Sequence, residues 1–250
     1  MNNNLIPWAS PFLFGNEKNL VNRALNSTWI SGGEYIDKFE KLIKKKFKIK
    51  NSYLVSNGTT ALHLAFLSIG LKKGDELIVP GYGYMAAANI GILMNLNVKF
   101  ADVDLHTFCI SLDSLKKIIT KKTRAVVVTH TYGNMFETLK IKSFLKKKRI
   151  IMIEDSAEAF GCQDFKKFSG TIGDIGTFSF HATKNIVTGE GGMISTNNKF
   201  YAKKIILYKN HGVAKERYKH LVPGHNFRIT NIQAALGIGQ LKNFAKIQKR

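Results

Sequence analysis

Hydrophobic and polar positions alternate along this chain with two different periods, and segments of the two kinds take turns. Short runs rich in Val, Ile and aromatic residues predict buried strands, at 52–55, 76–79, 98–101, 125–129, 150–153, 175–180 and 193–195. Segments with apolar residues every three or four positions predict helices, at 16–26, 35–47, 58–69, 84–94, 112–119, 137–148, 199–208 and 231–247. This alternation predicts an α/β fold, with a parallel sheet covered by helices on both faces and reactive groups at the carboxyl ends of the strands.

The composition is that of a globular protein with one large domain. The chain has 250 residues and 44% hydrophobic content, enough for a sizeable core. No apolar run approaches the length of a membrane span, and the first ten residues lack the order of a signal peptide. Cys109 and Cys162 lie far apart without metal-ligand spacing, and we expect both to be reduced thiols. We therefore expect a cytoplasmic protein with no membrane partner.

A formal net charge of +21 makes a basic nucleic-acid-binding protein the first alternative to an enzyme. The excess comes mostly from lysine, in short runs such as 44–46 and 146–148 that fall on polar helix faces or between elements. No aromatic residues are interleaved for stacking on bases, and no zinc, helix-turn-helix or RNA-binding signature is present. We therefore expect no nucleic-acid partner, although a positive field would help to attract an anionic substrate.

Small and hydroxyl-bearing residues follow the first expected strand. The turn 56–60 reads Ser-Asn-Gly-Thr-Thr and opens the helix 58–69. Free backbone N–H groups at a helix start can hold a phosphate, so the turn is a candidate phosphate cradle. An ordinary N-cap is the alternative, but the turn is richer in polar groups than a cap requires.

Aromatic and acidic residues follow two further strands. Tyr84 stands in the segment 80–84, where its ring could stack on a planar cofactor or equally pack into the core. Glu154, Asp155 and Glu158 follow the apolar run 150–153, where a carboxylate is costly without a partner. A carboxylate there can keep a pyridine nitrogen protonated. A helix N-cap or a metal site are the alternatives, and the lack of a nearby histidine at ligand spacing weighs against a metal.

Lys184 follows the strand 175–180 in a turn of small residues, before a glycine-rich segment at 189–192. Desolvation favours the neutral amine that attacks a carbonyl, so this lysine is a candidate for Schiff-base formation. A solvated loop lysine is the alternative in so lysine-rich a chain. A phosphate cradle, a ring stacker, a carboxylate and a lysine, with Ser179 on the strand, are together the parts of a pyridoxal-phosphate (PLP) site.

The chain resembles the DegT/DnrJ/EryC1/StrS family of PLP-dependent nucleotide-sugar aminotransferases from about Asn16 to Arg250. The matching segments are 56–64, 74–80, 132–134, 154–159, 173–180, 184–185, 189–193, 210–212, 226–228 and 233–237. The resemblance implies a three-layer fold with a mostly parallel central sheet and helices on both faces. This is the large domain of the aspartate-aminotransferase-like enzymes, PLP fold type I.

The resemblance also implies roles around the cofactor ring. Lys184 matches the catalytic lysine that forms the Schiff base, and Asp155 matches the carboxylate that pairs with the pyridine nitrogen. Glu158 matches the residue beside the ring, and Tyr84 matches the ring-stacking aromatic residue. Some family members carry His in place of the lysine and act as dehydratases, so Lys184 favours transamination.

Phosphate contacts follow from the same resemblance. Thr59, Thr60 and Ser179 match the family's phosphate-binding residues, with Gly58 in the same turn. Asn226 matches an asparagine that reaches the phosphate of the neighbouring subunit. The resemblance therefore implies a homodimer with a shared active site.

The substrate expected from the resemblance is a nucleotide-linked keto sugar, with L-glutamate as the amino donor. Glu158, the segment 27–31 and Glu190 look most like the perosamine-synthase branch, which aminates C4 of a GDP-linked 4-keto-6-deoxy sugar for surface polysaccharide or glycan precursors. Phe160 stands where that branch often has His, which leaves the nucleotide, the sugar and the choice of C3 or C4 open.

The expected domain plan has an N-terminal arm and substrate-side loop at 1–34 and a PLP-binding large domain at 35–250. Family members continue into a smaller C-terminal domain that closes over the substrate. Because the chain stops at Arg250, we expect that domain to be absent or truncated. A truncated, non-catalytic member of the same fold is therefore the second alternative to an active enzyme.

Overall fold

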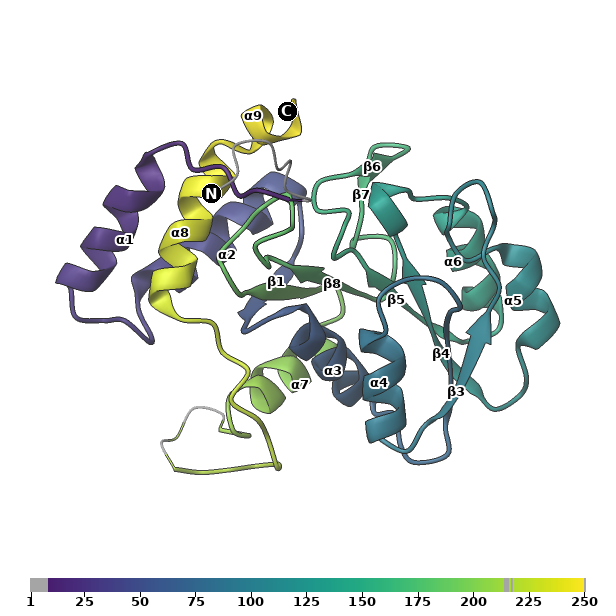
Figure 1. Ribbon diagram of the computed structural model, residues 1–250. Helices are drawn as coiled ribbons and strands as arrows, with labels where there is room; N and C mark the ends of the chain where they lie inside the picture. Colours follow the sequence, from purple (N-terminus) through teal and green to yellow (C-terminus); the bar gives the residue numbers. More distant parts are fainter. Residues whose placement is uncertain (1–8, 214–215, 217, 250) are drawn as a thin grey trace, which may run out of the picture.

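A seven-stranded sheet lies at the centre of the computed structural model, which describes residues 9–213, 216 and 218–249 (Figure 1). The strands are β1 (Asn51–Val55), β2 (Glu76–Pro80), β3 (Asn97–Ala101), β4 (Thr123–Thr129), β5 (Ile151–Asp155), β8 (Ile175–Ser179) and β9 (Gly192–Thr196), and a separate hairpin is formed by β6 (Gln163–Asp164) and β7 (Lys167–Phe168). The helices are α1 (Asn16–Asn26), α2 (Glu34–Phe47), α3 (Gly58–Ile69), α4 (Ala86–Leu93), α5 (Leu112–Ile118), η1 (Thr131–Gly133), α6 (Thr138–Lys147), α7 (Lys199–Lys209), α8 (Asn231–Lys242) and α9 (Phe244–Gln248). No helix in the described part of the chain is long and apolar enough to cross a membrane.

The strand order is β1-β9-β8-β5-β4-β2-β3, and β9 runs antiparallel to both of its neighbours. The remaining strands point in one direction, because β2 pairs in parallel with β3 and β4, β4 with β5, and β5 with β8. Their carboxyl ends therefore meet at one edge of the sheet. The expected mostly parallel sheet is confirmed, and β9 departs from it because it follows β8 through the loop 180–191 rather than through a crossover helix.

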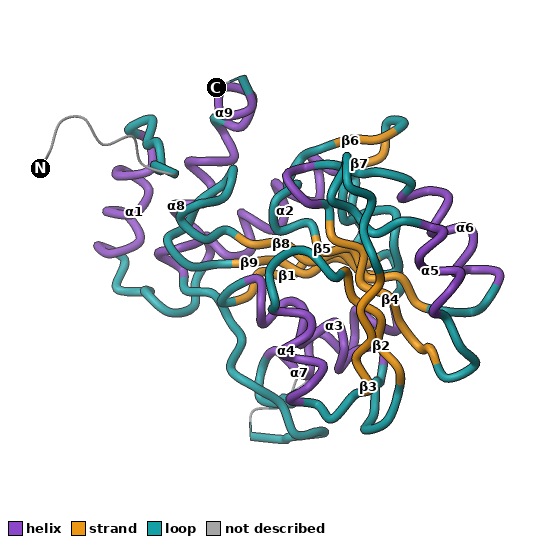
Figure 2. The backbone as a smooth tube through the Cα atoms, turned by 45° about the vertical axis from the view of Figure 1, so that its right-hand side comes forward, coloured by secondary structure: helices purple, strands orange, loops and turns teal. Residues whose placement is uncertain are grey.

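Helices cover both faces of this sheet (Figure 1 and Figure 2). The alternation of side chains along β4 shows how the faces divide: Ala125 and Val127 pack with α3, α4 and α7, whereas Val126 and Val128 pack with α5 and α6. On the second face, at the β1 end of the sheet, α2 and α8 pack over β1, β8 and β9. Both faces are apolar, as a largely parallel sheet requires.

Two helix boundaries differ from the expected ones. The helix expected from Tyr84 begins at Ala86, because Gly83 adopts φ +131° and extends the turn that precedes α4. The single helix expected over 231–247 is divided into α8 and α9 at Asn243. The Asn243 amide side chain donates to Gly239 O at 3.1 Å, and its backbone N–H turns to Gln240 O, so the regular ladder ends there.

Side chains replace a missing strand along the outer edge of β1. Leu54 N–H donates to Glu40 Oε1 at 2.9 Å, and Leu54 O accepts from Lys209 Nζ at 3.2 Å. The two charged groups lie 3.7 Å apart and are both largely buried. Burial raises the pKa of Glu40 and lowers the pKa of Lys209, so each depends on the other to stay charged. This pair therefore satisfies the backbone hydrogen-bonding groups of Leu54, on the strand that leads into the predicted phosphate turn.

Candidate cofactor site

The turn between β1 and α3 combines a helix cap with free hydrogen-bond donors. Asn57 caps α3, since its side chain accepts from Thr60 N–H at 2.8 Å while Thr60 Oγ1 accepts from Asn57 N–H at 3.2 Å. Thr60 Oγ1 also donates to Asn57 O at 2.8 Å, so its proton is committed inside the turn. The Gly58 and Thr59 amides make no hydrogen bond to the residues that the structure describes. Asn57 and Thr60 therefore form a helix cap, and the Gly58 and Thr59 amides are left able to donate to an anion. The assignment of Gly58, Thr59 and Thr60 to a phosphate stays a prediction.

Close packing brings Ser179 to the same turn. A Cβ atom added to Gly58 would lie 3.0 Å from Ser179 Cβ, which places the end of β8 against the start of α3. Ser179 Oγ accepts from His181 N–H at 3.2 Å and can still donate its own proton. Gly192 backs the turn, where a Cβ would come within 2.5 Å of the Asn57 carbonyl carbon. Only glycine allows β9 to approach the turn so closely.

Asp155 is the last residue of β5, and its carboxylate receives few hydrogen bonds from the described residues. It is 8% exposed, and one of its oxygens accepts from Ala157 N–H at 3.1 Å. Burial raises the pKa of Asp155, and the Ala157 N–H and the charges of His130 and Lys184 offset this only in part. The sequence predicted that this strand ends at residue 153. In the structure it continues to Asp155, because the backbone of Asp155 pairs with both neighbouring strands.

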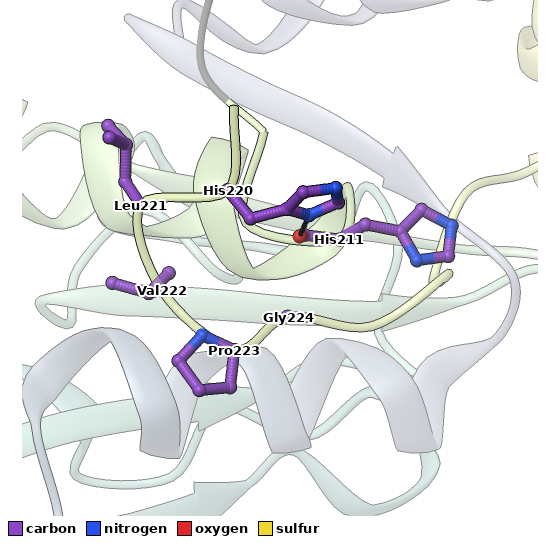
Figure 3. Close-up of a pocket in the computed structure, with 6 residues that line it drawn as sticks. All are labelled: His211, His220, Leu221, Val222, Pro223 and Gly224. Carbon is purple, nitrogen blue, oxygen red and sulfur yellow. Dashed lines mark hydrogen bonds between the residues drawn. The ribbon is translucent and has the colours of Figure 1, made fainter. Parts of the chain in front are cut away.

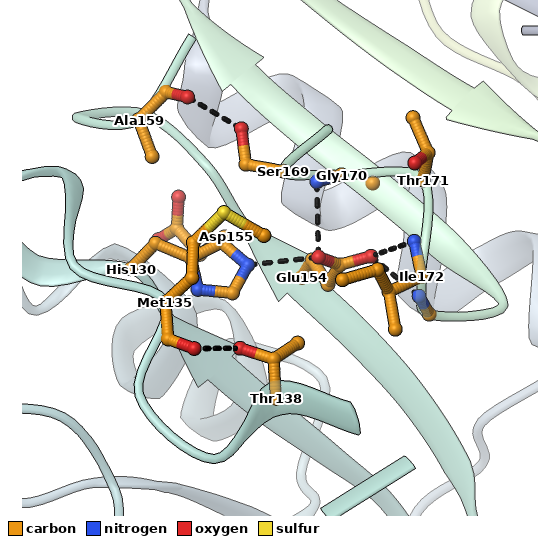
Figure 4. A network of polar contacts seen from close by, with 12 residues as sticks. His130, Met135, Thr138, Glu154, Asp155, Ala159, Ser169, Gly170, Thr171 and Ile172 are labelled. Atoms are coloured by element: carbon orange, nitrogen blue, oxygen red, sulfur yellow. Dashed lines mark hydrogen bonds and ion pairs between the residues drawn. The ribbon is translucent and has the colours of Figure 1, made fainter. Parts of the chain in front are cut away.

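Glu154 has the opposite surroundings, with donors on both of its oxygens (Figure 4). Its Oε2 lies 2.8 Å from His130 Nε2 and accepts from Gly170 N–H at 3.0 Å. Its Oε1 accepts from the Ile172 and Gly173 N–H groups. Glu154 therefore fastens the loop after β7 to β5, and its partners explain why a carboxylate is tolerated with no exposed surface.

Lys184 lies on the same side of the sheet as the two acidic residues predicted to work with it. Its Nζ is 3.4 Å from Glu158 Oε1, and both side chains are half-buried. Glu158 Oε2 accepts from Tyr132 N–H at 3.0 Å, so the carboxylate is fixed between the amine and the end of β4. Lys184 is thus a half-buried lysine with an acidic partner, and its assignment as the Schiff-base lysine stays a prediction.

Tyr84 and Asn226 lie at the surface. Tyr84 is 88% exposed directly before α4, so it is not a core residue. Asn226 forms an isolated β-bridge with Asn210, and its side-chain oxygen accepts from Arg228 Nε at 2.8 Å. Their assignment to ring stacking and to a neighbouring subunit's phosphate stays a prediction.

His130, Tyr82 and Tyr132 also belong to this edge of the sheet, and of these the sequence pointed only to Tyr82, as part of the aromatic turn 80–84. The signal that marked the other residues was present, because each of the three stands just beyond an apolar strand segment. His130, for example, comes directly after β4, and the strand predicted at 125–129 ends at the same residue, Thr129. A systematic search of all strand ends would have found them.

A cavity of about 450 Å³ lies elsewhere, against the loop that joins α7 to α8 (Figure 3). It is lined by His211, His220, Leu221, Val222, Pro223 and Gly224. His220 Nδ1 lies 2.7 Å from His211 O, which ties the middle of this loop to its start. None of the residues predicted from the sequence lines it.

Comparison with known proteins decides the family. The sequence model of the DegT/DnrJ/EryC1/StrS aminotransferase family matches residues 13–250. The chain belongs to this family. GDP-perosamine synthase from Escherichia coli O157:H7 is 44% identical over 239 residues, which cover 95% of this chain and 66% of that relative. The chain thus spans slightly less than two thirds of the length of this DegT/DnrJ/EryC1/StrS family member.

Solved structures of similar proteins confirm the fold. Helicobacter pylori PseC, an aminotransferase involved in the biosynthesis of pseudoaminic acid, matches with a TM-score of 0.91 and 28% identity over 96% of this chain and 66% of its own. E. coli GDP-4-keto-6-deoxy-D-mannose-3-dehydratase with bound hydrated PLP matches with a TM-score of 0.92 and 30% identity over 97% of this chain and 68% of its own.

Proposed function

We propose that this chain is the cofactor-binding part of a PLP-dependent aminotransferase that moves an amino group from L-glutamate to a nucleotide-linked 4-keto-6-deoxy sugar. The observation that carries the proposal is the position of Lys184, whose amine lies 3.4 Å from Glu158 at the sheet edge that also holds Asp155. A GDP-linked sugar is the first substrate to test, since a relative with 44% identity is a GDP-perosamine synthase.

The residues present fit PLP at both of its charged ends. The Gly58 and Thr59 amides and the Ser179 hydroxyl offer converging donors for the phosphate. Asp155 is a buried carboxylate with a raised pKa, and a protonated ring nitrogen would supply the cationic partner that the fold withholds. A buried charge that destabilises the protein alone and is paired by a bound ligand is typical of a binding site.

The mechanism assigns a distinct task to each side chain. When bound, PLP supplies an electron sink for the transfer of an amino group. The Lys184 amine can accept the proton from the donor's Cα as a general base and then, as a general acid, deliver it to the C4′ position of the bound cofactor. Glu158 holds that amine in place through its Oε1, while Asp155 keeps the proton on the ring nitrogen.

Covalent trapping tests this assignment. The protein is incubated with PLP and reduced with borohydride, and the modified peptide is located by mass spectrometry. Label is expected on Lys184 and should be lost in Lys184→Ala, whereas Lys122→Ala, an exposed lysine at the opposite end of β4, should keep it. Label that persists unchanged in Lys184→Ala would refute the proposal. Amination of a panel of nucleotide keto sugars then identifies the substrate.

A homodimer with a shared site is part of the same proposal. Tyr84 and the apolar Met85, Ile92 and Leu93 are all exposed around α4, which is unusual for a surface that faces only water. If Asn226 serves the partner's phosphate, an equimolar mixture of Lys184→Ala and Asn226→Ala subunits should regain about a quarter of wild-type activity. Random pairing makes about half of the dimers mixed, and each mixed dimer has one intact site of two. Activity in the mixture no higher than in the two variants alone would exclude a shared site.

A further inference from the structure

Three partly exposed aromatic side chains gather beside Lys184, and the mechanism uses none of them. Tyr82, Phe108 and Tyr132 are 41%, 37% and 64% exposed. They follow β2, β3 and β4, which are adjacent in the sheet. We call these three residues the aromatic platform. It continues the edge on which β5 and β8 carry Asp155 and Ser179.

Contacts among the three rings hold the platform together. Tyr82 Oη lies 2.9 Å from Tyr132 Oη, which joins two side chains that also face solvent. The ring of Phe108 lies 5.1 Å from that of Tyr82 and 6.2 Å from that of Tyr132, between centroids. The Tyr82 hydrogen bond raises the pKa of Tyr132. Rings fixed in this way present a surface with little conformational entropy left to lose on binding.

Two platform residues have backbone conformations that bulky side chains rarely adopt. Phe108 has φ +56° and Tyr132 has φ +53°, both in the left-handed region. Such a conformation is strained for a bulky residue, and it tends to persist where function requires a particular direction of the chain. At Tyr132 it directs the backbone N–H to Glu158 and the ring to the platform.

The platform is continuous with the proposed catalytic amine. Glu158 bridges the two, with Oε1 3.4 Å from Lys184 Nζ and Oε2 3.0 Å from Tyr132 N. Resting on the proposed function, we propose that the aromatic platform stacks against the hexose ring of the nucleotide sugar, and so determines which sugars are held at Lys184.

The hexose fits this position better than the nucleobase does. The keto carbon must reach Lys184, and only one carboxylate separates that amine from Tyr132. A diphosphate and a ribose separate the nucleobase from the hexose, so the nucleobase lies beyond the platform when the hexose is in place. A 6-deoxy hexose also has an apolar C–H face for an aromatic ring, and the paired tyrosine hydroxyls lie at the rim to meet its hydroxyl groups.

Binding of GDP-mannose and GDP to the PLP-loaded protein, measured by calorimetry, tests the proposal without requiring turnover. Phe108→Ala is expected to raise the Kd for GDP-mannose about tenfold and to leave the Kd for GDP unchanged. Phe108→Leu, which keeps apolar volume, should lose most of the same affinity. Phe200→Ala is the matched control, because this exposed phenylalanine lies in the first turn of α7 after the carboxyl end of β9, at the opposite edge of the sheet.

The tyrosine pair gives a second, independent measurement. Tyr82→Phe and Tyr132→Phe each remove the same hydrogen bond and keep both rings. Each is expected to raise the Kd for GDP-mannose about threefold, and the double variant should bind no more weakly than either single one. If the increase in Kd in the double variant equals the product of the two single increases, the two hydroxyls act separately. That result would contradict their action as a hydrogen-bonded pair.

Three results would overturn the platform. They are an unchanged Kd for GDP-mannose in Phe108→Ala, an equal loss of GDP affinity, and dissociation of an oligomer in that variant by light scattering, which would assign these rings to a partner subunit. Failure of the proposed function looks different, because the wild type would then show no glutamate-dependent change in cofactor absorbance. In the variants that glutamate response should keep its wild-type rate.

Discussion

Asp155→Asn should make the cofactor-free protein more stable and the cofactor-loaded protein less so. The wild-type carboxylate is 8% exposed and accepts one hydrogen bond from Ala157 N–H within the described fold. Asparagine keeps an acceptor oxygen and removes the buried charge. We expect a gain of about 1 kcal/mol in the free energy of unfolding without PLP, which is ~2–4 °C in Tm for a chain of this size.

The pH dependence follows from the raised pKa of Asp155. A carboxyl whose pKa is higher in the folded state keeps its proton when the unfolded chain has lost it. Its contribution to stability is therefore present at low pH and lost as pH rises through the folded pKa. The advantage of Asp155→Asn should vanish in acid and grow toward neutral pH.

Thermal unfolding with and without PLP is the assay, from acid to neutral pH. PLP at a hundred times its Kd should stabilise the wild type by about 2.7 kcal/mol and the variant by much less. Asp174→Asn is the control, and it should lower the free energy of unfolding. Asp174 pairs with Lys142 at 2.7 Å and accepts from Met152 N–H at 2.9 Å, so the fold stabilises its charge. A lower Tm for cofactor-free Asp155→Asn at neutral pH would show that the fold itself stabilises this carboxylate, and would refute the reasoning.

Three further substitutions test the parts around the site. Lys209→Ala should cost about 3 kcal/mol in urea unfolding, because the buried Glu40 loses its cation 3.7 Å away and keeps only Lys44, at 4.0 Å. Adding Glu40→Gln should recover most of the loss, and no recovery would mean that packing rather than charge is responsible. Gly192→Ala places a Cβ within 2.5 Å of the Asn57 carbonyl carbon, so PLP affinity by absorbance titration should fall more than tenfold, and unchanged affinity would place the phosphate elsewhere. Ser179→Ala should raise the Kd for PLP about tenfold and leave that for pyridoxal, which lacks the phosphate, unchanged; an equal effect on both would contradict a phosphate contact.

Local patterns in the sequence determined the elements and their order. The helix 58–69 was predicted to the residue, because the capping box at Asn57 and Gly70 at φ +79° mark its ends within the chain itself. Family membership was also evident from the sequence, since it depends on residue identities that are spread over most of the chain. Predicted helix boundaries were wrong where a side chain competes for backbone hydrogen bonds. The Asn243 side chain donates to the Gly239 carbonyl and ends the helix predicted over 231–247.

The tertiary structure alone decided which of the marked residues meet. The sequence placed Glu154 and Asp155 together as costly carboxylates, but the fold supplies His130 and the loop at 170–173 to the first and leaves the second in need of a cation. These partners are distant in sequence, so no local pattern encodes them. The bridge from Lys184 through Glu158 to Tyr132 has the same origin, because it depends on the order of strands in the sheet, and strand order is set by packing rather than by spacing along the chain.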